Sequence, residues 1–332
     1  MDPNQKALFQ SIKNLFKKET LSLVDEVSEV LHLEKGASYK RISGHTALKI
    51  DEVVKLCLHY NISFDSLLEQ NSGLNQISFV TEHVSITAST LKDFLVSFGR
   101  TFDSLRRGRD NEVILLGNEL PLPHYFDFPR LVTFLHHMWH HEKGGYQNAQ
   151  KKLETLNIQG ENLQIVGYLS HEFNNHPTTE IWGPGIFNAA FHRLKLGHRI
   201  GIINQAQTEE LYKDFGDLIE HLRKVAETGY KFNPETGRSY GEAQLMINKY
   251  YFGGSQVYYN TDGYEKAFIS TEYPDFIHTN DPRFTSRIRE KTYNYKAFSV
   301  NISKDNSLER SQYFRQQTTE WEKLGRELEN QM

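Results

Sequence analysis

Hydrophobic residues recur every three or four positions through most of the first seventy residues. The clearest stripe consists of Leu23, Val27, Val30 and Leu31, and Ser22 stands before it as a helix cap. The same spacing predicts helices over residues 5–17, 22–31, 35–43 and 49–60, with a short fifth helix beginning at Ser63. This segment is therefore expected to fold as a five-helix bundle.

The helical pattern ends at the breaker cluster Gln70-Asn71-Ser72-Gly73. We expect a first domain over residues 1–72, a linker over 73–89 and a second domain over 90–332. Helical spacing in the later part of the chain predicts helices over residues 90–107, 129–141, 184–203, 208–227 and 307–329.

Short apolar and aromatic runs predict the strands of the second domain. They cover residues 77–80, 112–117, 243–252, 256–259 and 264–271, with turns at Gly253-Gly254 and Asp262-Gly263. The last three strands are expected to form an antiparallel sheet. The predicted class is α+β, mainly α with a smaller antiparallel β portion: a helix-turn-helix five-helix bundle followed by a mixed α/β domain.

Two of the predicted helices carry apolar seams. The seam residues are Leu211, Phe215, Leu218, Leu222 and Val225 in one helix, and Phe314, Trp321, Leu324 and Leu328 in the last helix. The first seam has a 4-3-4-3 spacing, which is typical of helix packing. It leaves open whether the seams form a dimer interface or a core.

Composition narrows the class of protein. The 332 residues include one cysteine, Cys57, so an intrachain disulfide and a cysteine-based zinc cluster are excluded. We found no membrane-spanning run and no signal-peptide core at the N-terminus, and a reducing cytoplasm is the expected location. The formal net charge is −4, so binding to nucleic acid would require a local excess of positive charge.

Such an excess occurs between Glu34 and Asp51, in the predicted third helix and the start of the fourth. Lys35, Lys40, Arg41 and Lys49 follow one another between Glu34 and Asp51 with no acidic residue among them. A helix with a basic exposed face suits insertion into a major groove, where phosphates line both walls.

We therefore predict double-stranded DNA as the partner. The candidate DNA-binding residues are Ser22, Lys35, Ser38, Tyr39, Lys40, Arg41, His45 and Lys49. Lys35 and Tyr39 are expected to reach base edges, Arg41 to bind guanine or phosphate, and Lys40 to contact phosphate. The small Ser38 allows the close helix crossing of this motif.

The segment from Leu21 to Leu68 resembles the Cro and lambda-repressor type of helix-turn-helix. The elements Ala37-Ser38-Tyr39-Lys40-Arg41-Ile42 and His59-Tyr60-Asn61-Ile62-Ser63-Phe64-Asp65 resemble a bacterial subgroup with a large C-terminal partner domain. The resemblance implies a bacterial transcription regulator. At His32 the sequence departs from that family, which usually has glycine there.

Histidines supply the candidate metal ligands. His136, His137, His140 and His141 form two i,i+4 pairs, but a histidine-rich helix face is the favoured interpretation, and no metal or other cofactor is predicted. His171 and His176 are five residues apart, unlike a zinc-peptidase motif, and Asn174, Asn175 and Pro177 disfavour a helix.

The leading hypothesis is a non-enzymatic, homodimeric DNA-binding regulator whose C-terminal domain binds a small-molecule or protein effector. Two alternatives remain open. One is a protein-interaction adaptor whose helical N-terminal domain binds protein. The other is a small-molecule enzyme in the C-terminal domain, although we found no defensible acid, base or nucleophile grouping. The aromatic residues Tyr250-Tyr251-Phe252 and Tyr258-Tyr259 are expected either to line a ligand pocket or to fill a sheet core.

Overall fold

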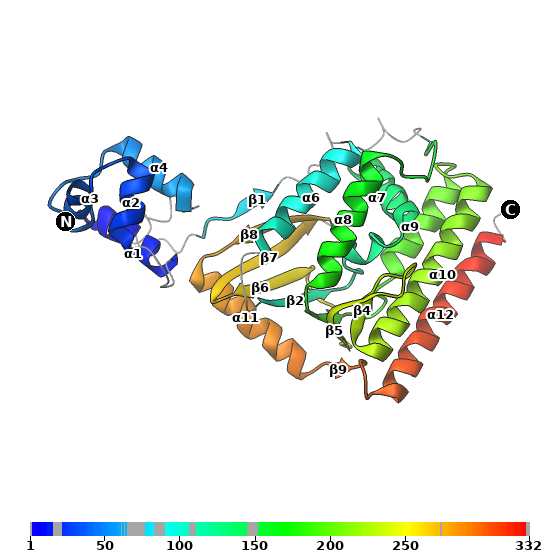
Figure 1. Ribbon diagram of the computed structural model, residues 1–332. Helices are drawn as coiled ribbons and strands as arrows, with labels where there is room; N and C mark the ends of the chain where they lie inside the picture. Colours follow the sequence, from blue (N-terminus) through cyan, green and yellow to red (C-terminus); the bar gives the residue numbers. More distant parts are fainter. Residues whose placement is uncertain are drawn as a thin grey trace. The chain divides into compact units, whose positions relative to one another are not determined.

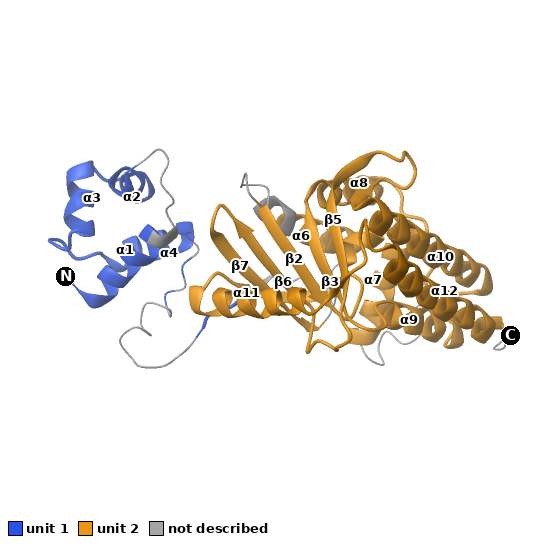
Figure 2. Ribbon diagram, turned by 90° about the horizontal axis from the view of Figure 1, so that it is seen from below, with its two compact units in different colours: residues 1–79 blue, residues 80–332 orange. Residues whose placement is uncertain are grey.

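The computed structural model describes residues 2–15, 22–60, 62, 64, 77–82, 90–105, 111–144, 152–272 and 274–329. Its contacts divide the chain into two compact units, Met1–Phe79 (unit 1) and Val80–Met332 (unit 2), coloured separately in Figure 2. Each unit is described by itself. Among the described helices, none combines the length and the apolar character that crossing a bilayer requires.

Unit 1 consists of short helices around one small core. The helices are α1 (Pro3–Leu15), α2 (Leu23–Leu31), α3 (Lys35–Ile42) and α4 (Ile50–Tyr60). Their inward side chains, among them Ile12, Val27 and Leu56, form a hydrophobic cluster of their own. The helices lie close to the positions that the sequence pattern predicts, and the expected fifth helix lies almost wholly outside the described residues.

Unit 2 is built on one large sheet (Figure 1). Its strands are β1 (Val80–Glu82), β2 (Asn111–Gly117), β3 (Thr178–Trp182), β4 (Tyr230–Phe232), β5 (Ser239–Ile247), β6 (Gln256–Thr261), β7 (Tyr264–Glu272), β8 (Asp275–Thr279) and β9 (Val300–Asn301). The strand order is β1-β8-β7-β6-β2-β3-β5-β4, and β9 pairs with β5.

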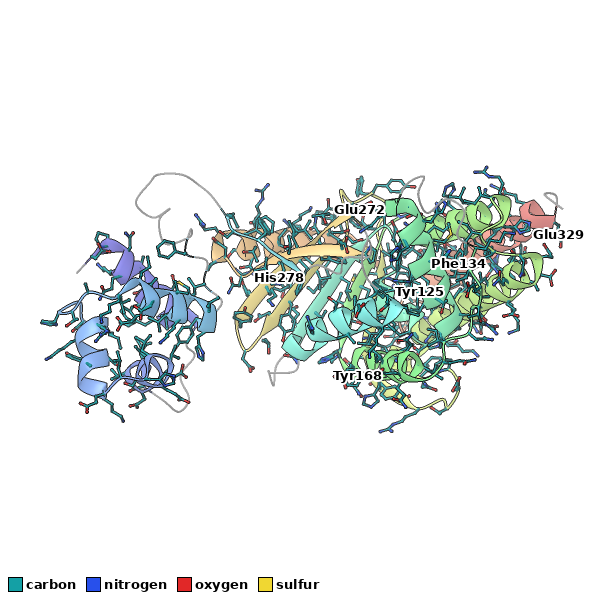
Figure 3. The ribbon with its side chains drawn as sticks, turned by 90° about the horizontal axis from the view of Figure 1, so that it is seen from above. Tyr125, Phe134, Tyr168, Glu272, His278 and Glu329 are labelled. Atoms are coloured by element: carbon teal, nitrogen blue, oxygen red, sulfur yellow. The ribbon has the colours of Figure 1, made fainter. Side chains whose placement is uncertain are left out.

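All but the last of the helical elements of unit 2 connect these strands, and the last one ends at Glu329, which is labelled in Figure 3. They are α6 (Leu91–Leu105), the 3-10 helix η1 (Leu122–Tyr125), α7 (Pro129–Gly144), α8 (Glu161–Asn175), α9 (Asn188–Arg199), α10 (Gln205–Thr228), α11 (Pro282–Ala297) and α12 (Ser307–Glu329). The chain is therefore a mixed α+β protein in which helix predominates.

The centre of the sheet is parallel, so the prediction of an antiparallel sheet is wrong there. Strand β3 pairs in parallel with both β2 and β5, whereas β6, β7 and β8 are antiparallel to their neighbours. Helical crossovers connect β2 to β3 and β3 to β5, as parallel pairing requires. The β6–β7 hairpin forms at the predicted turn, where Asp262 and Gly263 have φ values of 47° and 79°.

Both faces of the sheet are covered, which explains the continuous apolar run in β2. Val113 packs into the larger core with most of the helices, whereas its neighbour Ile114 packs into a second cluster with Ile288 of α11. The same alternation separates Ile181 from Trp182, because successive side chains of a strand point to opposite faces. Figure 2 shows α11 running along its own face of the sheet.

The apolar seams of α10 and α12 belong to the core of unit 2. All five seam residues of α10 are buried, together with Phe314, Leu324 and Leu328 of α12. Trp321 stacks on Tyr212 with ring centroids 4.5 Å apart and donates a hydrogen bond to its carbonyl oxygen. Of the two interpretations of these seams, the structure favours core packing. Tyr258 and Tyr259 likewise lie in the sheet core, whereas Tyr250 and Tyr251 are exposed.

Several elements differ from the prediction. The expected helix over residues 184–203 is confined to α9, since Gly185 has a φ of 69° in the preceding turn. Helix α8 runs to Asn175, so the expectation of no helix around His171 is wrong. The predicted linker contains β1, which pairs with β8 and so belongs to the sheet. The sequence pattern did not reveal β3, β8 or α11.

Candidate functional site

The turn between α2 and α3 sets the geometry of the candidate DNA-binding face. His32 ends α2 in the left-handed conformation, with φ 53° and ψ 48°, and the Leu33 amide donates to the Ser28 carbonyl at 2.9 Å. Left-handed backbone favours glycine, so His32 adopts the conformation for which glycine would be the natural choice. Helix α3 begins three residues later, after a short connection.

The N-terminal ends of α2 and α3 are tied together. Ser22 caps α2, since its hydroxyl oxygen accepts a hydrogen bond from the Asp25 amide at 3.3 Å. The Asp25 carboxylate also pairs with the Lys35 ammonium group at 2.6 Å, and this hydrogen bond lowers the pKa of Asp25. Lys35 remains 76% exposed, so a phosphate group could compete with Asp25 for it.

Of the five predicted residues on α3, three face solvent, one is buried and one, Arg41, is half-buried. Lys35, Tyr39 and Lys40 are exposed. Ser38 has no exposed surface, so its side chain cannot contact DNA, and its placement among the DNA-binding residues is not supported. Its Oγ has no hydrogen-bond partner among the described residues. Ser38 lies where α3 packs against the rest of unit 1, in agreement with the predicted role of a small residue there.

The Arg41 side chain forms an ion pair with Glu52 of α4. Its Nε lies 3.0 and 2.9 Å from the two carboxylate oxygens, and its Nη2 lies 2.7 Å from Oε1. The hydrogen bond from Arg41 lowers the pKa of Glu52, although burial opposes this shift. The guanidinium group is engaged by this pair and is only 13% exposed, so the predicted binding of guanine or phosphate by Arg41 would require Glu52 to release it.

The loop from α3 to α4 carries the remaining predicted residues. His45 and Lys49 are exposed, and the His45 Nδ1 lies 2.7 Å from the Ser43 hydroxyl. Gln5 of α1 holds this loop: its amide nitrogen donates to the carbonyls of Arg41 and Thr46, and its oxygen accepts from the Leu48 amide.

Gln5 was not singled out from the sequence. The one signal available is a polar residue on the inward side of an amphipathic helix. A buried amide with these three bonds fixes the loop that presents His45 and Lys49, so Gln5 is a positioning residue for the candidate face.

The positive charge of this face is smaller than the sequence suggests. Of its four cations, Lys35 pairs with Asp25 and Arg41 with Glu52. Lys40 and Lys49 have no ion-pair partner within the described part of the chain. An approaching phosphate would therefore meet two unpaired lysines and a third that it must share with Asp25.

Unit 2 contains a buried polar cluster around Glu180 of β3. The Glu180 carboxylate accepts hydrogen bonds from Trp182 Nε1 at 3.1 Å and the Thr178 hydroxyl at 3.1 Å, and lies 2.7 Å from His124 Nε2. Burial alone would raise its pKa, but the charge and hydrogen bond of His124 outweigh burial and lower it. Every oxygen of this carboxylate is thus occupied by protein groups.

Lys231 of β4 lies close to the same cluster. It donates to the carbonyls of Phe173 and His176 at 3.0 and 2.7 Å, and its ammonium lies 3.8 Å from the centre of the Phe173 ring. Burial lowers the pKa of Lys231 to about 7, against the opposing charges of Glu180 and Asp127. These contacts fix Lys231 inside the fold, where it connects α8 to the sheet.

A second group of buried polar residues surrounds Asp127. Ser170 and Asn174 of α8 donate hydrogen bonds to its carboxylate, and His221 Nε2 lies 4.0 Å away. Burial lowers the pKa of His221 to about 3, so this ring is neutral at pH 7. The Ser170 hydroxyl donates to the Asp127 carboxylate, and no histidine accepts from it among the described residues, so the arrangement differs from the Ser–His pairing of nucleophilic serine catalysis.

The histidines of α7 do not form a metal site with three or more ligands. No such group occurs among the described residues. His136 is buried beside Phe94 and its ring centre lies 5.1 Å from that of His140. Burial, with His140 and His137 acting in the same direction, lowers the pKa of His136 to about 4.

Comparison with known proteins adds nothing to this geometry: no family model matches the sequence, and no curated protein or solved structure matches the chain.

Proposed function

We propose that the protein is a sequence-specific DNA-binding transcription regulator whose helix α3 enters the major groove. The observation that carries this proposal is the exposed face of α3, where Lys35, Tyr39 and Lys40 extend away from the core of unit 1. A short helix with cations and an exposed aromatic side chain on its outer face suits a groove lined by phosphates. The short connection at His32 supports the proposal, because helix-turn-helix motifs join their helices in this way.

The candidate residues then divide by role. The N-terminus of α2, at Ser22, would meet the phosphate backbone with the amide groups of its first turn. Lys35 and Tyr39 would face base edges, and Lys40, His45 and Lys49 would contact phosphate or sugar. In this function Arg41 acts through Glu52 and orients α3 without touching DNA.

The test begins with selection of duplexes from a random library by the full-length protein. Fluorescence anisotropy over a range of salt concentrations then gives the affinity and its salt dependence. Lys40→Gln should reduce the slope of log K against log salt by about 1, because one phosphate contact is lost. Lys323→Gln, which removes an exposed lysine of α12, is the matched control and should leave the slope unchanged.

Tyr39→Ala should instead alter the selected sequence, since this residue is assigned to base edges. Failure to select any sequence, or equal effects of Lys40→Gln and Lys323→Gln, would reject the proposal.

We further propose that the protein binds DNA as a homodimer in the cytoplasm, with unit 2 providing dimerisation and the response to an effector. One helix contacts few base pairs, and two copies on a palindrome supply the specificity that regulation needs. A two-fold symmetric footprint and a sedimentation coefficient of a dimer are the expected results.

One observation favours protein binding by unit 1 as the second candidate function. Ile50, Val54 and Leu58 follow one another at i, i+4 and i+8 on α4 and are 76%, 48% and 77% exposed. An exposed apolar stripe of this kind is typical of interaction surfaces. Tight binding of a protein partner in high salt, without salt-dependent DNA binding, would favour this adaptor function.

A further inference from the structure

An apolar cavity lies on the face of the sheet that carries most of the helices in unit 2. Its walls come from the sheet and from α6, η1 and α8, and the lining includes Phe98, Leu115, Phe173, Trp182, Val257 and Phe276. These residues belong to six different elements that are far apart in the sequence. The cavity is therefore a product of the tertiary fold of unit 2.

Two side chains on the central strands remain partly accessible where they border the cavity. Leu115 of β2 and Val257 of β6 are paired with each other in the middle of the sheet. Both point toward the helix-bearing face, yet both remain partly accessible, whereas their neighbours Leu116 and Tyr258 are buried. Since central strands normally bury such side chains completely, the exposed area of Leu115 and Val257 is the floor of a space that protein atoms do not fill.

Three polar side chains of the walls are already engaged, whereas the buried Gln256 Oε1 has no hydrogen-bond partner among the described residues. The Trp182 indole N–H and the Thr178 hydroxyl donate to Glu180, behind the cavity surface. Glu119, at the edge of the lining, pairs with Arg193 at 2.9 Å. Neither lysine nor arginine occurs in the described lining, so a bound anion would find no unpaired cation.

From these observations we propose that this cavity is a binding site for a small, neutral, aromatic molecule. Aromatic walls contact flat rings favourably, and the cavity, about 120 Å³ in volume, has room for one ring of such a ligand. Carboxylates and phosphates are excluded as ligands, because burying an unpaired charge among apolar side chains is strongly unfavourable.

Phe276 connects the cavity to the edge strand of the sheet. Phe276 lies on β8, and its pairing partner across the strands is Glu82 of β1. Strand β1 has three residues, lies at the edge of the sheet and is the first element of unit 2 after unit 1 in the chain. A ligand that packs against Phe276 holds β8 in place and so stabilises the β1–β8 pairing.

Two fluorescent probes of one skeleton test the ligand class. N-phenyl-1-naphthylamine is neutral, and 1-anilinonaphthalene-8-sulfonate is the same molecule with a sulfonate group. Titration into the full-length protein without DNA should show the neutral probe binding at least about tenfold more tightly. Equal or tighter binding of the sulfonate, or no saturable binding of the neutral probe, would overturn the proposal.

A filling substitution locates the site. Val257→Trp should abolish binding of N-phenyl-1-naphthylamine, and Val96→Trp, on the exposed side of α6, should not. The thermal unfolding midpoint of each variant shows whether it is folded, and the comparison of probes on the unaltered protein does not depend on either variant. Retained binding by a folded Val257→Trp variant would place the probe elsewhere and refute the assignment.

Hydrogen exchange tests the connection to β1. Saturation with N-phenyl-1-naphthylamine should slow amide exchange in residues 80–82, and unchanged exchange with the probe bound would overturn the coupling. Because none of these measurements contains DNA, their failure is distinct from failure of the proposed DNA-binding function.

Discussion

Removing Arg41 from its ion pair with Glu52 should destabilise unit 1 by about 2 kcal/mol. The two side chains are 13% and 10% exposed, which places the pair between a buried and a surface pair. Removing one partner of a fully buried pair costs about 3–5 kcal/mol, and exposed pairs contribute about 0.2–1 kcal/mol. Since Arg41→Met leaves Glu52 with a single hydrogen bond, from the Lys49 amide, we expect an intermediate loss.

Hydrogen exchange on the full-length chain measures this loss within unit 1. A change of about 2 kcal/mol corresponds to an increase of roughly 30-fold in the opening equilibrium of α3 and α4. All three tryptophans lie in unit 2, so their fluorescence provides an internal control that should not change. A double-mutant cycle with Glu52→Met isolates the pair, and the double variant should lose much less than the sum of the single variants.

The pH dependence has a definite sign. Glu52 has a pKa below its usual value of 4.5, because Arg41 donates hydrogen bonds to the carboxylate and outweighs burial. A lowered carboxylate pKa contributes stability above the unfolded pKa, and this contribution disappears as pH falls through the folded value. Stability of unit 1 should therefore decline below about pH 4.5, and less so in Arg41→Met. Additive single substitutions and an unchanged acid response would refute the pairing and leave Arg41 available for DNA.

Three further substitutions test the packing. His32→Gly should stabilise unit 1 by about 0.5 kcal/mol, because glycine adopts the left-handed conformation without strain. Hydrogen exchange measures the change, and unchanged stability would contradict the prediction. Ser38→Ala should stabilise α3 by about 1 kcal/mol, since it removes a buried hydroxyl with no described partner. DNA affinity should not change, and weaker DNA binding would show that Ser38 contributes to the DNA interface. Gly216→Ala should lower the free energy of unfolding of unit 2 by about 1–2 kcal/mol, because the new Cβ would lie 2.7 Å from Trp321. Urea unfolding followed by tryptophan fluorescence measures this loss, and an unchanged midpoint would show that the ring can move.

Periodicity identified the elements whose stability is largely local. The helices of unit 1, the strand at residues 112–117 and the hairpin at Asp262-Gly263 all carry their own pattern or turn residues. Strand β3 escaped detection because it has five residues and contains Glu180, a charged residue that sequence patterns assign to solvent. Its burial depends on His124, which lies 56 residues earlier in the chain.

The roles of the candidate site residues depended on similar distant partners. The exposure of Lys35, Tyr39 and Lys40 followed from the helical pattern of α3. The ion pair between Arg41 and Glu52 could not be predicted from that pattern. Glu52 lies eleven residues away on another helix, and the crossing of α3 and α4 decides whether the two side chains meet. A basic residue identified from sequence is therefore only a candidate for DNA contact. The structure must first show whether an acidic side chain already pairs with it.

These internal pairs bear directly on how strongly the protein can bind DNA under the proposed function. Each copy brings three lysines to the duplex, Lys40 and Lys49 at phosphates and Lys35 in the groove, so log K should fall with a slope no steeper than about −3 against log salt. A slope that small gives weak non-specific binding, and the formal net charge of −4 adds no general attraction. Stable occupancy at physiological salt would then require two copies on adjacent half-sites, for which the slope would approach about −5. A measured slope near −3 together with nanomolar affinity would mean that base contacts, and not a second copy, supply most of the binding energy.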